Sequence, residues 1–183
     1  MIYAIGMISR SSANLRYISF QIEAMATAAN ALAEYLPSGV KLAPFRDEAE
    51  YAWHQQWKPL SQRKPPHGGW DWATLRWDYR NEPTTLAVAI WSEEVLSALL
   101  LGRLNNTAAR IDYLEGSPDV NDPLRGKVIP LAIEIGARYA QKAGRAELWL
   151  MDPVPALREF CKRAFRFEYV EPRGKIPFCR REV

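Results

Sequence analysis

The chain has 183 residues, 48% of them hydrophobic, which is enough for one domain with a substantial core. Its net charge of +3 is too small to indicate nucleic acid as a partner, because the basic residues are interleaved with acidic ones. Two cysteines and two histidines provide neither a disulfide framework nor a Cys/His zinc site, so we expect no metal and a reducing, cytoplasmic location. No apolar run approaches the ~20 residues of a membrane span, and the apolar start lacks the basic region and cleavage site of a signal peptide.

A long helix is the first predicted element. Ser11 and Ser12 are suitable N-caps, and Pro37 and Gly39 end the helix. Apolar residues recur along it at alternating steps of three and four, namely Leu15, Ile18, Ile22, Met25, Ala29, Leu32 and Leu36. The resulting stripe either packs against the core of the domain or forms the seam of a homodimer, since a 3.5-residue repeat is typical of paired helices.

Residues 40–79 combine short elements with a concentration of tryptophan. We predict a strand over 40–45, a helix over 46–57, a loop over 59–69 that is rich in proline and glycine, and a short helix over 70–79. Five of the seven tryptophans fall in this region: Trp53, Trp57, Trp70, Trp72 and Trp77.

Three strands with short connections are predicted next, over 86–91, 95–104 and 108–115, and they form an antiparallel meander. On the third strand, simple alternation places Ile111 and Tyr113 on one face. The same alternation places Arg110, Asp112 and Leu114 on the other face.

A basic loop that leads into a helix is the most informative stretch of the chain. Arg125, Gly126 and Lys127 precede a helix that we expect to begin near Pro130, because proline costs no hydrogen bond at the first helical position. Such a helix start presents unpaired N–H groups and the positive end of the helix dipole, which suit a phosphate group. The helix also carries a ridge of small residues that would allow close approach to a sheet, at Ala132, Gly136 and Ala140.

The remaining elements are a buried strand over 147–151, a helix over 156–165, and strands over 167–170 and 175–180. From residue 40 the order is therefore strand, two helices, three antiparallel strands, helix, strand, helix and two strands. Together with the segments RGKVI (125–129), LWLMDP (148–153) and FCKRAFRFEYV (160–170), this order resembles the GNAT superfamily of N-acyltransferases.

The resemblance implies a fold of the α/β (α+β) class, with a mixed, mostly antiparallel central sheet flanked by helices. It covers residues 40–183, so residues 1–39 would be an added N-terminal helical extension. It also implies a small-molecule or protein amine as acceptor and acetyl-CoA as acyl donor. From the charge distribution and the lack of a spanning run we expect neither nucleic acid nor membrane as a partner.

The resemblance implies a coenzyme A site around the basic loop, where backbone N–H groups hold the pyrophosphate. The cofactor-binding residues would be Tyr113, Arg125, Gly126, Lys127, Val128, Ile129 and Leu131. The family's loop pattern is Arg/Gln-x-x-Gly-x-Gly/Ala, and this chain departs from it, since Val128 and Pro130 stand at the two glycine positions.

The implied reaction is direct attack of a neutral amine on the thioester. Asp112 and Glu115 on the strand before the loop are the candidate bases, although both could instead be ordinary carboxylates, for example partners of Arg110. Many family members place a tyrosine on the last helix as general acid, and that position falls here on Cys161 or Lys162.

The tryptophan-rich region falls where the family builds its acceptor pocket. The residues that would line this pocket are Trp57, His67, Trp70, Asp71 and Trp72. Alternatively, these tryptophans close the core over the sheet.

Two function classes follow. The first, which the order of elements, the basic loop and the possible acceptor pocket favour, is a CoA-dependent N-acetyltransferase. The second, which the altered loop and the missing tyrosine favour, is a catalytically inactive GNAT-like module that acts through a ligand or a protein partner.

Overall fold

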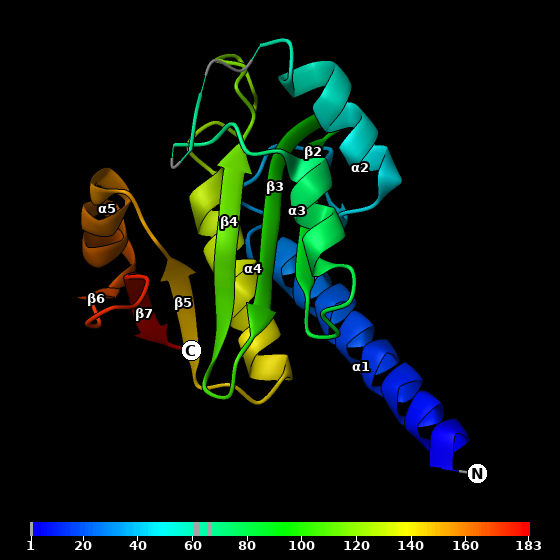
Figure 1. Cartoon of the computed structure of the whole chain (residues 1–183). Helices are drawn as coiled ribbons and strands as arrows, with labels where there is room; N and C mark the ends of the chain where they lie inside the picture. Colours follow the sequence, from blue (N-terminus) through cyan, green and yellow to red (C-terminus); the bar gives the residue numbers. More distant parts are fainter. Residues whose placement is uncertain (1, 61–62, 66) are drawn as a thin grey trace.

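The computed structural model describes residues 2–60, 63–65 and 67–183, with side chains described from Asn14 onward. Seven strands form one sheet in the order β1-β2-β3-β4-β5-β7-β6 (Figure 1). The strands are β1 (Val40–Pro44), β2 (Leu86–Ser92), β3 (Val95–Leu104), β4 (Ala108–Gly116), β5 (Glu147–Met151), β6 (Glu168–Val170) and β7 (Phe178–Glu182). Every neighbouring pair is antiparallel except β4 and β5, which confirms the predicted mixed, mostly antiparallel sheet.

Helices cover both faces of the sheet. They are α1 (Ile2–Ala31), α2 (Asp47–Ala52), the π-helical turn η1 (Trp53–Trp57), α3 (Trp72–Tyr79), α4 (Val128–Lys142) and α5 (Pro155–Phe165). Residues of α1 and α4 pack on one face, while α2, η1 and α3 pack on the other. Figure 1 shows α3 in front of the sheet and α4 behind it.

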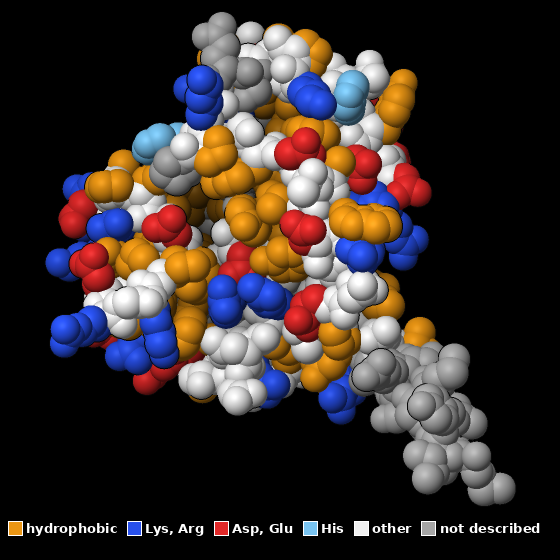
Figure 2. All heavy atoms as spheres, viewed as in Figure 1, with side chains coloured by type: hydrophobic (Ala, Val, Ile, Leu, Met, Phe, Trp, Pro, Cys, Tyr) orange, Lys and Arg blue, Asp and Glu red, His pale blue; other side chains and the backbone are white. Residues whose placement is uncertain are grey.

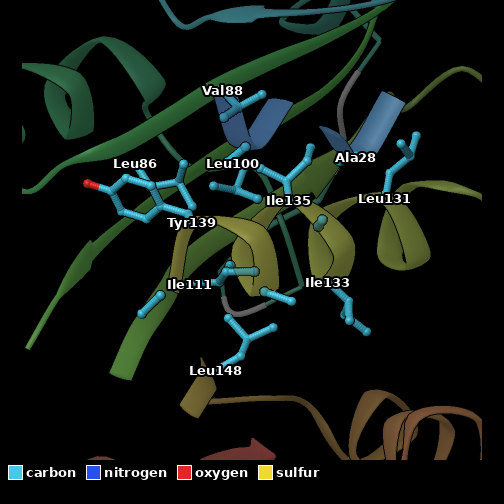
Figure 3. Packing of buried hydrophobic residues seen from close by; sticks show 14 of the residues in the cluster. Ala28, Leu86, Val88, Leu100, Ile111, Leu131, Ile133, Ile135, Tyr139 and Leu148 are labelled. Carbon is cyan, nitrogen blue, oxygen red and sulfur yellow. The ribbon is translucent and has the colours of Figure 1, made fainter. Parts of the chain in front are cut away.

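The larger core lies between the sheet and helix α4 (Figure 3). Ile135 and Tyr139 of α4 are fully buried there against strand residues such as Leu86 and Leu100. The predicted ridge of small residues explains the close approach, because a Cβ atom on Gly136 would lie 2.7 Å from the side chain of Leu148 on β5. The close packing of helix and sheet therefore leaves no room for a larger side chain here unless Leu148 shifts.

The second core contains tryptophans. Trp57 and Trp72 are both buried, and each indole N–H has a partner. The N–H of Trp57 donates to the carbonyl of Leu96 at 2.7 Å, and that of Trp72 donates to Glu115 at 2.8 Å. Both residues are part of the core, where a buried indole needs both apolar neighbours and a hydrogen-bond acceptor. Trp57 also borders a small cavity of about 190 Å³ that Trp70 and Asp71 line as well.

Helix α1 differs from the prediction in its start and in its buried face. It begins at Ile2, so Ser11 and Ser12 lie within the helix rather than capping it. The residues buried against the domain are Gln21, Ala24, Met25 and Ala28. By contrast, three members of the predicted stripe are exposed: Leu15, Ile18 and Ile22. The C-terminal half of α1 is thus part of the core, and the exposed stripe leaves the homodimer a prediction. No helix in the described ranges is long and apolar enough to cross a membrane.

A β-bulge interrupts strand β4 at Asp112. Leu101 of β3 is opposite Tyr113, while the next residue, Gly102, is opposite Ile111, so Asp112 is an extra residue on β4. As a result, Ile111 packs in the core on the α4 side and Tyr113 packs with the core on the α3 side. The predicted alternation, which put these two residues on one face, is therefore wrong beyond the bulge.

Candidate active site

Strands β4 and β5 separate halfway along β4. Residues 108–111 pair with residues 147–150, but β4 continues to Gly116 whereas β5 ends at Met151 (Figure 1). Two pockets open at this separation. Four residues line both of them: Leu114, Ile129, Val154 and Leu157. The two pockets therefore meet where the strands diverge.

The first pocket, which we call the loop pocket, has a volume of about 940 Å³. It lies between the segment that leads from β4 into α4 and the first half of α5. Its lining includes Gly116, Arg125, Gly126 and Val128 from the first side, and Ala156 and Phe160 from the second.

The start of α4 presents unused backbone donors to the loop pocket. The helix begins at Val128, so Pro130 is its third residue rather than its first. Two turns tie the loop together, since Arg125 N–H donates to the Asp122 carbonyl at 3.0 Å and Lys127 N–H donates to the Leu124 carbonyl at 2.9 Å. Within the described part of the chain, the N–H groups of Gly126, Val128 and Ile129 donate no hydrogen bond. Since Gly126, Val128 and Ile129 also line the pocket, these donors fit an anionic group.

Buried polar atoms without partners gather in the same pocket. Ser97 Oγ, Asp122 Oδ2 and Arg63 Nε have no hydrogen-bond partner among the described residues, and all three residues line the loop pocket. Buried polar atoms in folded proteins are nearly always paired with protein, ligand or water. These three residues therefore add polar groups to the wall of the loop pocket.

The second pocket, which we call the strand pocket, has a volume of about 490 Å³. Its walls include Trp70, Tyr79, Tyr113, Ile111, Leu150 and Pro153, and its polar lining residues are His67, Arg103, Arg110, Asp112 and Asp152. Figure 2 shows a hollow with hydrophobic walls on this face, with basic side chains gathered at its lower end. A mostly apolar cavity with a few polar groups is typical of a small-molecule site.

Asp112 lies at the edge of the strand pocket and is held from three directions. Its Oδ2 accepts a hydrogen bond from the Tyr79 hydroxyl at 2.7 Å, and its Oδ1 accepts one from Arg110 at 2.6 Å. Arg103 Nε lies 3.4 Å from Oδ2, and the Asp112 side chain is only 7% exposed. Burial and the hydrogen bond to Asp112 raise the pKa of Tyr79, so this phenol stays protonated and keeps donating.

No family model and no curated protein matches the sequence. The structure is similar to an acetyltransferase from Thermus thermophilus, with a TM-score of 0.57 and 18% identity over 79% of this chain and 97% of that chain. It is also similar to an acetyl transferase from Salmonella typhimurium that modifies the N-terminal serine of the 50S ribosomal subunit protein L7/L12, with a TM-score of 0.57, 10% identity, and 80% and 96% of the two chains covered.

A third similar structure is Mycobacterium smegmatis RimJ in complex with CoA-disulfide, with a TM-score of 0.51 and 14% identity over 79% of this chain and 82% of that chain. The chain has the GNAT fold. The resemblance inferred from the order of elements is thereby confirmed for the fold.

Within the GNAT fold, the expected cofactor residues fall into three groups. Four of them line the loop pocket: Arg125, Gly126, Val128 and Ile129. Lys127 is the N-cap residue of α4. Two lie elsewhere, since Leu131 is fully buried in the core and Tyr113 lines the strand pocket. Of the expected acceptor-pocket residues, His67 and Trp70 line the strand pocket, while Asp71 caps helix α3 by accepting from Thr74 N–H.

Glu115 is occupied by structural contacts. Its Oε1 accepts from Gly69 N–H at 2.7 Å and lies 3.4 Å from Arg63, and its Oε2 accepts from Trp72. The side chain is 2% exposed and lines neither the loop pocket nor the strand pocket. The geometry therefore replaces the expected role as base with a positioning role: Glu115 holds the loop that carries His67 against β4.

The two candidates for a general acid on α5 both lie outside the two pockets. Cys161 is fully buried, and burial raises the pKa of its thiol to about 12. Lys162 is exposed but lines a separate surface depression beside β6. Neither side chain lines the loop pocket or the strand pocket, so neither is placed to protonate a leaving thiolate there.

Asp152 also lines the strand pocket, although no pattern in the sequence had singled it out. It follows β5 directly and is exposed. Its φ of 43° is in the left-handed region, which aspartate tolerates, and its N–H donates to the Pro177 carbonyl at 2.8 Å. No hydrogen bond or ion pair to its carboxylate exists within the described residues. The signal available in the sequence was an acid between a buried strand and Pro153.

Proposed function

We propose that this protein is a CoA-dependent N-acyltransferase that moves an acetyl group from acetyl-CoA to an amine. The observation that carries the proposal is the meeting of two pockets at the point where β4 and β5 separate. One pocket suits a phosphorylated cofactor and the other suits an amine. RimJ from Mycobacterium smegmatis, which shares the fold, was solved in complex with CoA-disulfide, and this supports a coenzyme A site in the present chain.

The cofactor's phosphates would be held by the N–H groups of Gly126, Val128 and Ile129 at the start of α4, with the Arg125 side chain adding a positive charge. Pro130 removes no donor that this arrangement uses, because the three available donors precede it. Acetyl-CoA supplies an activated acyl thioester when bound.

The strand pocket would orient the amine and accept its proton. Asp152 supports this role because it is exposed, lines the pocket, and has a carboxylate that no described residue binds. A positioned carboxylate acts as a general base directly or through one water molecule. His67 lines the same pocket and is the alternative proton acceptor.

Melting curves with millimolar acetyl-CoA, coenzyme A or ATP test the cofactor site first. Ligand at 100 times its dissociation constant adds about 2.7 kcal/mol of stability, so acetyl-CoA and coenzyme A should each raise Tm by several degrees and ATP should not. Release of free thiol in the presence of an amine panel then tests turnover. The absence of any shift would favour the inactive binding module.

A pair of glycines provides a matched control for the location of the site. Gly126 and Gly174 both have left-handed φ angles, of 80° and 68°, and no atom lies within 4 Å of a Cβ built on either. Only Gly126 lines the loop pocket. Gly126→Trp should abolish the melting shift with acetyl-CoA, while Gly174→Trp, which carries the same backbone strain, should retain it.

A further inference from the structure

The strand pocket has more positive charge around Asp112 than Asp112 needs. Arg110 and the Tyr79 hydroxyl already satisfy one oxygen each of this carboxylate. Arg103 adds a second guanidinium at 3.4 Å, so two cations surround one anion. One arginine and one hydroxyl are enough to compensate a single buried carboxylate, and the second guanidinium therefore leaves a net positive charge at this end of the pocket.

Arg103 is placed to use that charge on a ligand. Its guanidinium lies 5.3 Å from the centre of the Tyr79 ring, which fixes its position, and its side chain is 41% exposed. Only Nε contacts Asp112, and the two terminal nitrogens of Arg103 donate to no described residue. Arg110, whose side chain is 23% exposed, lines the same end of the pocket. The N–H donors of a guanidinium group lie in one plane, so a pair of them can donate to the two oxygens of a carboxylate.

The rest of the strand pocket complements an apolar amine. Trp70 and Tyr113 pack edge to face at 5.7 Å and form an aromatic wall. Asp152, which directly follows β5, lines the same cavity. The pocket thus combines a cationic end, apolar walls and a separate carboxylate.

We propose that the acceptor is a small amine that carries its own carboxylate on an apolar body, as an amino acid does, with Arg103 and Arg110 binding the carboxylate. This inference rests on the proposed function, because only an acyltransferase makes the bound amine an acyl acceptor. Binding of the carboxylate itself does not require acetyl-CoA. An amine that carries no carboxylate, such as the amine of a protein side chain, would leave the cationic end without a partner.

Binding of acylated product analogues tests the site without cofactor. N-acetyl-L-phenylalanine and N-acetyl-L-phenylalaninamide have nearly the same shape, but only the first carries a carboxylate; the matching leucine pair tests a smaller body. Calorimetry should show the acids binding at least about tenfold more tightly than the amides, because a charge-assisted hydrogen bond contributes that much. Equal affinity of acid and amide, or no binding of either acid at millimolar concentration, would overturn the inference.

Variants locate the effect. Arg103→Gln should reduce the acid's affinity to that of the amide, and Arg103→Lys should restore part of the difference; both should fold, because Asp112 keeps Arg110 and Tyr79. Arg138→Gln is the matched control, since Arg138 is also partly exposed and paired with a carboxylate, Glu134, but lines neither pocket. An unchanged preference in Arg103→Gln, or an equal loss in Arg138→Gln, would overturn the assignment.

Turnover separates this inference from the proposed function. L-phenylalanine should have a kcat/KM at least about tenfold above that of L-phenylalaninamide. Acetylation of amines with no preference for the acid overturns the inference and leaves the proposed function intact. Preference for the acid in binding, together with no response to acetyl-CoA, overturns the proposed function and leaves the carboxylate site intact.

Discussion

Gly102 of β3 lies so close to Arg110 of β4 that a Cβ atom at position 102 would be 1.9 Å from the Arg110 carbonyl oxygen. This contact occurs beside the bulge in which Asp112 is the extra residue. Bulges turn side chains away from simple alternation, and here Asp112 meets Tyr79 of α3 and Arg103 of β3. The backbones of β3 and β4 thus come into close contact, which only glycine allows, next to the polar residues of the strand pocket.

Gly102→Ala should therefore destabilise the protein by about 1–3 kcal/mol, the usual cost of forcing an atom into a filled space. Urea denaturation measures the loss. Gly116→Ala is the control on the neighbouring strand, because its Cβ would make an ordinary 3.5 Å contact with Val128. Equal stability of the two variants would show that β3 and β4 adjust more readily than the geometry indicates.

Asp152→Asn should keep the fold and lose the reaction. Asparagine tolerates the left-handed backbone, and the carboxylate accepts no hydrogen bond from the described residues, so Tm should change little. If Asp152 accepts the amine's proton, kcat should fall about 10²- to 10⁴-fold. Thiol release at saturating acetyl-CoA measures this. An unchanged kcat would move the role to His67.

Glu115→Gln should have the opposite effect to Asp152→Asn, because it should lower the stability of the protein more than it lowers kcat. Both oxygens of Glu115 accept hydrogen bonds, so the amide NH₂ of glutamine must face a donor, either Gly69 N–H or Trp72 Nε1. The expected cost is about 1–3 kcal/mol of stability. Because the loop that carries His67 would loosen, the acceptor's KM should rise more than kcat falls. A stable variant with a strongly reduced kcat would contradict the positioning role.

The buried thiol of Cys161 should make the protein sensitive to alkali. Its pKa rises from 9.0 to about 12 on folding, so the unfolded chain loses this proton at a lower pH than the folded chain. The contribution to stability is complete below pH 9.0 and is lost progressively up to about pH 12. The free energy of unfolding should fall with pH in this window, by at most about 1.4 kcal/mol per pH unit for this group.

Half-buried Tyr79 and buried Tyr139 and Cys179 also have raised pKa values and act in the same direction. Cys161→Ala isolates the one thiol, since its unfolding free energy should decline less steeply with pH than that of the wild type. Parallel declines would contradict the assignment. Retention of thiol-release activity in this variant would also agree with the position of Cys161 outside both pockets.

The sequence predicted those parts of the fold that depend on local patterns. The strands over 95–104 and 147–151 agree in full with the structure, because each is an apolar run with turn or loop residues on both sides. The donors at the start of α4 were also predictable from a basic loop that runs into a helix. Arg125, Gly126, Val128 and Ile129 accordingly line the loop pocket.

The structural features that the sequence did not predict depend on contacts between distant segments. The bulge at Asp112 follows from the approach of Gly102, which no local pattern on β4 reveals. Tryptophan suits both cores and pockets, so its spacing could not show that Trp57 and Trp72 are buried with satisfied N–H groups. Asp152 needed the separation of β4 from β5 to become a pocket residue.

Helix α1 allows a direct test of which face belongs to the core. Ala28 is fully buried, so Ala28→Glu places an unpaired carboxylate in the core and should unfold the chain or cost several kcal/mol. Ile22 is 50% exposed, so Ile22→Glu should leave Tm nearly unchanged. Sedimentation of the Ile22→Glu variant then tests the homodimer, since a dimer built on the exposed stripe would become monomeric. Unfolding of Ile22→Glu would instead show that this side of the helix is needed for the core.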